Sequence, residues 1–422
     1  MEYRLVTHTK PHKPIVFFLF LLVMLANYNI YIGFALKPYM LFSIFYLIFF
    51  MNYFRFYKMQ LYEILMLLFY LLYCFTGVFS LYPASSLRIL IGIFIYIACY
   101  FVMRAILGRT NGTIINQSIA AVGILFNLAS LILYFAGLVK VRFLFEGDRI
   151  YEYGMMLDRD YPRLVGLMQD PNFFVFYNTI FFAYYLSNTK STINKLGLAL
   201  CIITNLLTFS RGGLLVMIIL LAVYIVLNNP IKNIKLIVGI ALSLVTTFIV
   251  LVNMNFNLYE LLSSRVEASS EDGGSGRLVL WGRAWDYFTS NMYTGIGAFN
   301  FSDYNTFDYG DSLTVHNTFL DILAESGLLG IFFYMMFIAI VFAQLIRQKV
   351  HRTNSYLFLT FLGFVLQMGF LSVIINDIFF LYLAILSNHL NNHVILQKSK
   401  VHPESMSPLR GGVYDERFIT DR

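Results

Sequence analysis

The feature that most constrains this fold is a succession of apolar blocks, each about as long as a bilayer is thick. The block at 234–252 is typical, with a single charged residue, Lys235. About 20 apolar residues in helical form cross the hydrocarbon core. The chain is 59% hydrophobic and only 13% charged, about half the charge of a soluble domain. These features predict an all-α polytopic membrane protein.

About twelve candidate spans can be drawn from the blocks. The first follows Arg4, Lys10 and Lys13, as in a signal peptide, but it is too long for the apolar core of one. We therefore expect it to stay as an uncleaved span. The least certain division is the short break at Ser210-Arg211. The predicted spans are 15–36, 39–54, 61–82, 87–107, 115–138, 167–187, 194–209, 212–229, 234–253, 327–346, 356–374 and 376–393.

Lys and Arg residues predict the orientation, because short cytoplasmic loops are enriched in them. With a cytoplasmic N-terminus, every predicted inside loop carries at least two such residues. The sequence then divides into a cytoplasmic N-terminus (1–14), a transmembrane bundle (15–253), a long extracytoplasmic loop (254–326), further transmembrane helices (327–396) and a disordered cytoplasmic tail (397–422).

The cations predicted outside call for another explanation than topology. Lys37 and Arg88 stand alone, and the others gather at 140–163, at Arg211 and in the long segment 253–326. A polar segment of that length between spans is usually functional or disordered.

The long segment combines a linker with two predicted amphipathic helices. Residues 269–276 (SSEDGGSG) are typical of a flexible linker. A surface helix is predicted over 277–288, and a second short helix over 316–325 leads through Gly327 into the next span. The apolar stripe of the first helix is predicted to be Leu278, Trp281, Trp285 and Phe288.

Several other classes of protein are disfavoured. Cys74, Cys99 and Cys201 lie inside apolar blocks, so they are predicted to be packing residues without disulfides. No zinc-ligand spacing occurs, and we predict no metal and no cofactor. The net charge of +7 belongs mostly to short loops and the tail, and no nucleic-acid partner is expected.

Two groups of candidate residues lie at predicted helix starts. The first is Arg163 with Asp170-Pro171-Asn172, where Asp-Pro-Asn could equally be a helix cap beside a snorkelling arginine. The second is Arg211, whose neighbours Gly212 and Gly213 allow close approach of a ligand. An ionisable residue at membrane depth predicts function, although Arg211 could simply end a span.

Two more groups lie in the long segment. Arg277 and Arg283 are six residues apart, so on a helix they point about 120° from one another. Arg277 is the better candidate, and Arg283 could as well contact a lipid phosphate. His316 and Asn317 precede the second helix, which carries Glu325 and Asp321. A lone histidine is more often structural, yet it can accept a proton near neutral pH.

Together these groups favour transfer from a lipid diphosphate. Arginine suits phosphate binding and can stabilise the charge of a leaving diphosphate without a metal. His316 would take the proton from an attacking sugar hydroxyl.

The sequence resembles the O-antigen ligase and polymerase superfamily of bacterial membrane glycosyltransferases over about 160–350. The resemblance implies a GT-C-like helical fold and an undecaprenyl-diphosphate-linked glycan as donor. It implies catalytic roles for His316, Arg211 and Arg277; substrate binding is predicted for Arg163, Arg283, Asp170, Asn317 and Glu325. The matching motifs are Arg163-(x)6-Asp170-Pro171-Asn172, Phe209-Ser210-Arg211-Gly212, Gly276-Arg277-(x)3-Trp281, Gly295-Ile296-Gly297 and Val315-His316-Asn317-(x)7-Glu325-Ser326-Gly327-Leu328-Leu329-Gly330.

The reaction within the family stays open. A polymerase extends a lipid-linked glycan, whereas a ligase transfers the glycan to lipid A-core. Thr314 stands where ligases often have a further histidine, and Asp170-Pro171-Asn172 is more typical of polymerases, so the polymerase is favoured. A protein O-oligosaccharyltransferase would have a larger extra domain. The alternative from another class is a lipid-linked-oligosaccharide flippase, disfavoured because the spans hold few charges.

The predicted setting is the bacterial inner membrane, with both termini cytoplasmic and the active site periplasmic. The expected partners are the lipid-linked donor, a lipid-linked or lipid A-core acceptor, the bilayer and a chain-length regulator protein.

Overall fold

The computed structural model describes residues 13–31, 34–51, 54, 58–145, 150–158, 161–228 and 276–401, with a few single positions between 238 and 249. Four predictions fall wholly or largely outside these residues. They are the N-terminus before Lys13, the span 234–253, the linker 269–276 and the tail after Val401.

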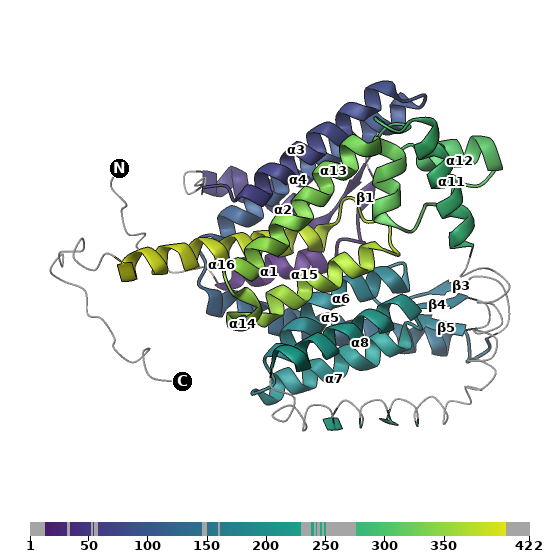
Figure 1. The fold of residues 1–422 in the computed structure, drawn as a ribbon. Helices are drawn as coiled ribbons and strands as arrows, with labels where there is room; N and C mark the ends of the chain where they lie inside the picture. Colours follow the sequence, from purple (N-terminus) through teal and green to yellow (C-terminus); the bar gives the residue numbers. More distant parts are fainter. Residues whose placement is uncertain are drawn as a thin grey trace.

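The described chain is mostly helical, and its long helices pack side by side (Figure 1). Each predicted span that the structure describes contains an apolar helix, but two of these helices are shorter than predicted. In the predicted span 15–36 the helix ends at Met24 and short strands follow at 30–31 and 35–36, and in 356–374 the helix ends at Met368. The helices are α1 (Lys13–Met24), α2 (Pro38–Phe50), α3 (Leu61–Thr76), η2 (Gly77–Phe79), α4 (Pro83–Leu107), α5 (Gly112–Lys140), α6 (Pro171–Ser187), α7 (Thr192–Leu207), α8 (Arg211–Leu227), α11 (Arg277–Ser290), α12 (Phe301–Tyr309), α13 (Thr318–Arg347), α14 (Val350–Thr353), α15 (Ser355–Met368) and α16 (Asp377–Val401).

Only some of the described helices are long enough to span a membrane. Within the described ranges, four helices are long and apolar enough to cross a bilayer: Leu61–Phe79, Pro83–Leu107, Gly112–Lys140 and Thr318–Arg347. Shorter apolar helices complete the bundle: α15 packs on α13, and α8 packs on α15 and α6. The fold is therefore that of a largely helical membrane protein, and the number of crossings stays a prediction.

A small sheet and the short helices α11 and α12 lie together at one end of the bundle (Figure 1). This end is called the site end below. Strands β3 (Ile150–Glu152), β4 (Met155–Asp158) and β5 (Tyr161–Leu164) form an antiparallel sheet, with Met156 opposite Arg163. They connect α5 to α6. A separate hairpin joins β1 (Ile30–Tyr31) to β2 (Ala35–Leu36).

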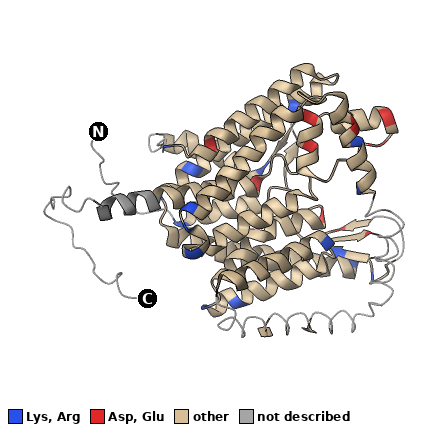
Figure 2. Ribbon diagram, viewed as in Figure 1, with Lys and Arg blue, Asp and Glu red and all other residues tan. Residues whose placement is uncertain are grey.

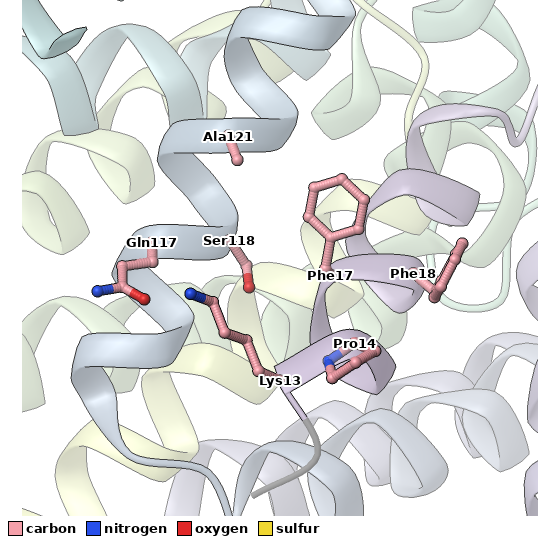
Figure 3. Close-up of a pocket in the computed structure, with 7 residues that line it drawn as sticks. All are labelled: Lys13, Pro14, Phe17, Phe18, Gln117, Ser118 and Ala121. Atoms are coloured by element: carbon pink, nitrogen blue, oxygen red, sulfur yellow. The ribbon is translucent and has the colours of Figure 1, made fainter.

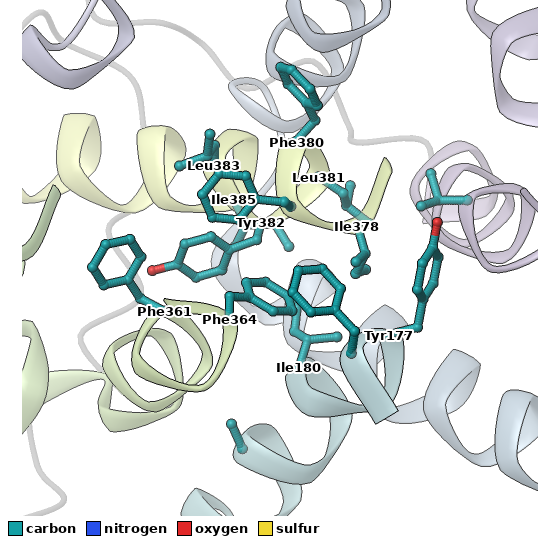
Figure 4. Packing of buried hydrophobic residues seen from close by; sticks show 14 of the residues in the cluster. Tyr177, Ile180, Phe361, Phe364, Ile378, Phe380, Leu381, Tyr382, Leu383 and Ile385 are labelled. Carbon is teal, nitrogen blue, oxygen red and sulfur yellow. The ribbon is translucent and has the colours of Figure 1, made fainter. Parts of the chain in front are cut away.

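The core is built around α6, α15 and α16. Most side chains of α6 are buried, and α6 packs on α15. Phe361 and Phe364 of α15 meet Tyr382 of α16 in a layer of interlocking rings (Figure 4). Rings in such offset and edge-to-face pairs add stability beyond their buried area. This rigid centre fixes the helix ends that face the site.

Lys37, which is isolated from the other outside cations in the sequence, has a buried partner in the structure. Its Nζ lies 2.6 Å from Oδ2 of Asp377, and the same carboxylate accepts hydrogen bonds from Tyr39 and Tyr177. The Lys37 and Asp377 side chains are only 18% and 3% exposed. A buried charge needs such partners. The pairing arises because the starts of α2 and α16 meet, which no local sequence pattern encodes.

The start of α13 contains a break in the helix at Gly327, whose φ is 60° and ψ −159°. Residues 292–297 fill the gap. Ile296 and Gly297 donate backbone hydrogen bonds to the carbonyls of Ala324 and Glu325, and Leu328 donates to Met292. The inserted segment thus takes the place of helical bonds that the break removes.

The apolar stripe predicted for 277–288 is only partly right. Helix α11 buries Phe288, and Trp281 is half-buried and donates from its indole nitrogen to the Val315 carbonyl at 3.1 Å. Leu278 and Trp285, however, are 58% and 53% exposed. The buried face is rotated because α11 packs on α13 and α12 through Leu280, Ala284, Tyr287 and Phe288.

Candidate active site

Of the helices that begin at the site end, α6, α8 and α13 each have a start that is capped by a polar side chain. Asp170 accepts hydrogen bonds from the backbone of Asn172 and Phe173 at α6, and Ser210 accepts from Gly213 at α8. Asn317 accepts from the backbone at the start of α13. Ser210 also donates to Asn172 at 2.6 Å, which ties α6 to α8. Helix N-termini carry partial positive charge and favour anions.

Arg163 on β5 joins the sheet to the turn before Arg211. Its Nε donates to the Thr208 carbonyl at 3.0 Å, and its guanidinium lies 3.2 Å from Asp158. Asp158, on the neighbouring strand, was not among the predicted residues. The pair holds Arg163 beside the α7–α8 turn, so the exposed Arg211 at the start of α8 and Arg163 belong to one surface.

Arg277, at the start of α11, lies within range of the charges on this surface. Burial lowers the pKa of Arg277, the Asp170 carboxylate opposes that effect, and the like charges of Arg211 and Arg163 add to it. Because these charges act on Arg277, Asp170, Arg163 and Arg211 lie within electrostatic range of its guanidinium.

His316 completes the cluster. Burial lowers the pKa of His316 below its ordinary value; the nearby Arg277 adds to this effect and Asp170 opposes it. The imidazole is therefore neutral at pH 7 and can accept a proton. The structure thus brings together Arg163, Asp170, Arg211, Arg277 and His316.

Two residues of this region have unfavourable backbone conformations. His316 has φ 54° and Phe209, two residues before Arg211, has φ 50°. Left-handed conformations cost energy for residues with a side chain, and they concentrate at functional sites. Here they turn the chain sharply just before α8 and α13.

The segment between α15 and α16, residues 369–376, links two of these helix starts. The Phe370 ring lies so close to Gly212 that an added Cβ would meet it at 2.6 Å. Thr318 donates its hydroxyl to the Leu371 carbonyl at 2.5 Å and accepts from the Val373 backbone at 3.0 Å. The segment therefore contacts the starts of both α8 and α13.

Replacement of Thr318 by valine is expected to lower stability by about 1–3 kcal/mol, because two buried backbone groups lose their partner. Replacement by serine keeps the hydroxyl and should restore most of the loss. Thermal unfolding of the purified protein in detergent measures both. Equal melting temperatures for the valine and serine variants would contradict this role of the hydroxyl.

Three predicted substrate-binding residues are engaged by the protein itself. Asn317 caps α13. Glu325 is buried, accepts from Tyr73, and accepts from the Phe301 backbone at 3.1 Å, so it ties α3 and α12 to α13. Arg283 binds Asn305 and Asp311 at 2.7 and 2.8 Å. Their positions indicate that they shape the region around the site.

Asp158, Thr318 and Phe370 were not predicted from the sequence. Asp158 and Arg163 are five residues apart on paired strands, and this charge pair was the only local signal. Thr318 follows the His316-Asn317 motif directly. Nothing in the sequence near Phe370 indicates its contact with Gly212, which is far away along the chain.

An open, mostly apolar groove of about 460 Å³ lies elsewhere, between α1 and α5 (Figure 3). It is lined by Lys13, Phe17, Gln117 and Ser118, among others. Gln117 and Ser118 belong to the half of α5 that is farther from the sheet, so the groove is not part of the cluster. Among the described residues, no three His, Cys, Asp or Glu side chains gather as metal ligands.

Comparison with known families gives one match. Residues 196–335 match the family described as O-antigen ligase. No curated protein matches the chain. The matched region runs from α7 to the middle of α13 and includes Arg211, Arg277 and His316.

Proposed function

We propose that this chain is a glycosyltransferase of the bacterial inner membrane. The premise is that residues 196–335 place it in the O-antigen ligase and polymerase superfamily. Its donor is a glycan linked to undecaprenyl diphosphate. The observation that carries the proposal is the clustering of Arg163, Arg211 and Arg277 with His316 at the start of helices.

In the proposed reaction, an acceptor hydroxyl attacks the sugar carbon that is bonded to the diphosphate. A new C–O bond forms, the bond to the phosphate oxygen breaks, and the diphosphate leaves with the electron pair. Arg211 and Arg277 stabilise the growing negative charge. The capped helix starts of α6 and α8 add a favourable field.

His316 is the proposed general base. Its lowered pKa keeps the imidazole neutral, so the ring can take the proton from the acceptor hydroxyl. The Asp170 carboxylate acts to raise the pKa of both His316 and Arg277. It would therefore stabilise the imidazolium after proton transfer and help orient Arg277. Arg163 would contact the outer phosphate oxygens.

The proposed location of the site is periplasmic. Arg104, Arg109, Lys195 and Arg347 lie at or next to the ends of α4, α5, α7 and α13 that are opposite to the ends leading to the site. Several of the blue segments lie at the end of the bundle away from the sheet (Figure 2). Cytoplasmic ends are rich in such residues. The site end would therefore face the periplasm.

Polymerisation of repeat units is the favoured reaction. Thr314 replaces the histidine often present in ligases, and Asp170-Pro171-Asn172 is typical of polymerases. The alternative is ligation to lipid A-core, to which the description of the matched family points.

A deletion strain complemented with Arg211→Ala is expected to lose long glycans, with transfer lowered about 10²–10³-fold because one charge-stabilising group is gone. Arg88→Ala, which removes an exposed arginine of α4 outside the cluster, should restore the wild-type ladder. The measurement is the surface glycan ladder beside the lipid-linked pool.

If the deletion strain carries single repeats on its surface, the protein is a polymerase. If the deletion strain keeps long chains on the lipid carrier, the protein is a ligase. Restoration of wild-type glycans by Arg211→Ala would refute the proposed site.

A further inference from the structure

Arg283 was expected to contact phosphate, yet it lies under an aromatic ring. Its guanidinium carbon is 3.8 Å from the centre of the Tyr309 ring, in a cation–π contact. Asn305 and Asp311 hold the guanidinium from the side at 2.7 and 2.8 Å. The Tyr309 side chain is nevertheless 49% exposed. One face of the ring is thus fixed by the protein, and the rest is open.

Two carboxylates lie close to Tyr309 along the chain, and Asp311 pairs with the arginine that contacts the ring. Asp308 accepts a hydrogen bond from Tyr287 through Oδ2 only, at 2.7 Å. The side chain of Asp311 is 34% exposed although it pairs with Arg283, and its hydrogen bond with Arg283 lowers the pKa of Asp311, so it is ionised. The stretch 301–315 contains three aspartates and no lysine or arginine. The red patch on α12 and the loop after it shows this charge (Figure 2).

A rigid ring with carboxylates nearby in the chain is suited to a sugar. The C–H face of a pyranose packs on an aromatic face, and carboxylates accept hydrogen bonds from its hydroxyls. Because Arg283 immobilises the ring beforehand, little side-chain entropy is lost on binding. A membrane surface is the weaker alternative, because Arg283 offsets only one of the three carboxylates and anionic lipids would repel the remaining negative charge.

The position of Tyr309 also suits the proposed donor. Arg277 and Arg283 lie on the same helix, about 9 Å apart along its axis at 1.5 Å per residue. Tyr309 precedes His316 by seven residues, so it lies at most roughly 25 Å away. A glycan whose diphosphate is held at Arg277 would reach Tyr309 with sugars beyond the first.

We propose that Tyr309, with Asp308 and Asp311, forms a subsite for an outer sugar of the glycan substrate, selective for sugars without acidic groups. The inference rests on the proposed function, because it takes the glycan held at Arg277 as its ligand. Arg283 is the positioning residue that fixes the ring.

The test uses the purified full chain in nanodiscs and, as probe, the repeat-unit oligosaccharide that mild acid releases from the lipid-linked pool of the host. Saturation-transfer NMR measures binding. Tyr309→Ala should raise the dissociation constant about tenfold or more, and Tyr309→Trp should retain binding. The matched control is Phe307→Ala, on the same helix and 79% exposed, which should bind as the wild type does.

Equal binding by wild type and Tyr309→Ala, or no saturation transfer to the probe in the wild type, would overturn the subsite. So would quenching of the added fluorescence of Tyr309→Trp by brominated lipids, since the ring would then lie in the bilayer. A raised KM for the lipid-linked donor in Tyr309→Ala would assign the subsite to the donor glycan, and a raised KM for the acceptor would assign it to the acceptor glycan. Probe binding requires no turnover, so it can succeed even if Arg211→Ala refutes the transferase.

Discussion

Replacement of His316 by glutamine is expected to lower the rate of glycan transfer by about 10²–10⁴-fold, the usual contribution of a general base. Glutamine has a similar size and can donate and accept hydrogen bonds, but it cannot take a proton from the acceptor hydroxyl. The measurement is transfer from a purified lipid-linked donor by the protein in nanodiscs. Donor binding should change little, because the diphosphate contacts belong to the arginines.

The wild-type enzyme should show an acid limb that reports His316. Its pKa is lowered from the ordinary value of about 6.5, first by burial and then by Arg277. The neutral base is therefore present at pH 7 and is lost only as the pH falls through the lowered pKa. In Arg277→Gln the acid limb of the remaining activity should shift to a higher pH, because loss of the positive neighbour raises the pKa of His316.

The matched control for His316 is His351→Gln in α14, which follows the far end of α13. It should transfer at the wild-type rate and keep the same pH profile. A His316→Gln enzyme within threefold of wild type would exclude the histidine as the base. An acid limb that does not move in Arg277→Gln would assign that limb to another group.

The positions of most helices could be predicted because membrane thickness sets the length of an apolar block. The same argument could not predict the contacts between helices. Lys37 looked isolated in sequence, yet its partner Asp377 lies 340 residues away. Such a pair depends on which helix starts meet, and block length has no information about that. Likewise, Leu278 and Trp285 fit an apolar stripe, but the packing of α11 on α13 buries a different face.

The candidate site was predictable where residue type carries the chemistry. Arg163, Arg211, Arg277 and His316 were predicted because they lie in outside segments, where membrane topology does not require cations. The structure brings these four together. Arg283 has the same chemistry, but its guanidinium contacts the Tyr309 ring. Six residues of helix turn Arg283 about 120° away from Arg277. Spacing on the helix gave the first hint of that difference, and the aromatic partner became visible only in the structure.

The largest effect on stability is expected for Gly327→Ala. The φ and ψ of Gly327, 60° and −159°, lie in a region that is almost closed to other residues. An added Cβ would meet the backbone carbon and oxygen of Tyr293 at 2.5 Å. Backbone atoms cannot move aside as a flexible side chain can, so residues 292–297 would be pushed out of the helix gap.

Displacement of that segment removes several hydrogen bonds at once. The Ile296, Gly297, Leu328 and Leu329 backbone donors all depend on the close approach of the two segments. Strain and lost bonds together should cost roughly 4 kcal/mol or more, measured as the loss of thermal stability in detergent.

The control for Gly327→Ala is Gly310→Ala at the end of α12. Gly310 also has a positive φ, 75°, but its ψ of 10° is close to the left-handed helical region, and an added Cβ would meet nothing within 4 Å. It should cost only about 1 kcal/mol. If both variants melted at the same temperature, the inserted segment would not hold the break in α13. A large loss for Gly327→Ala alone would show that the Gly295-Ile296-Gly297 and Glu325-Ser326-Gly327 motifs act as one unit that sets the start of α13, and with it the position of His316.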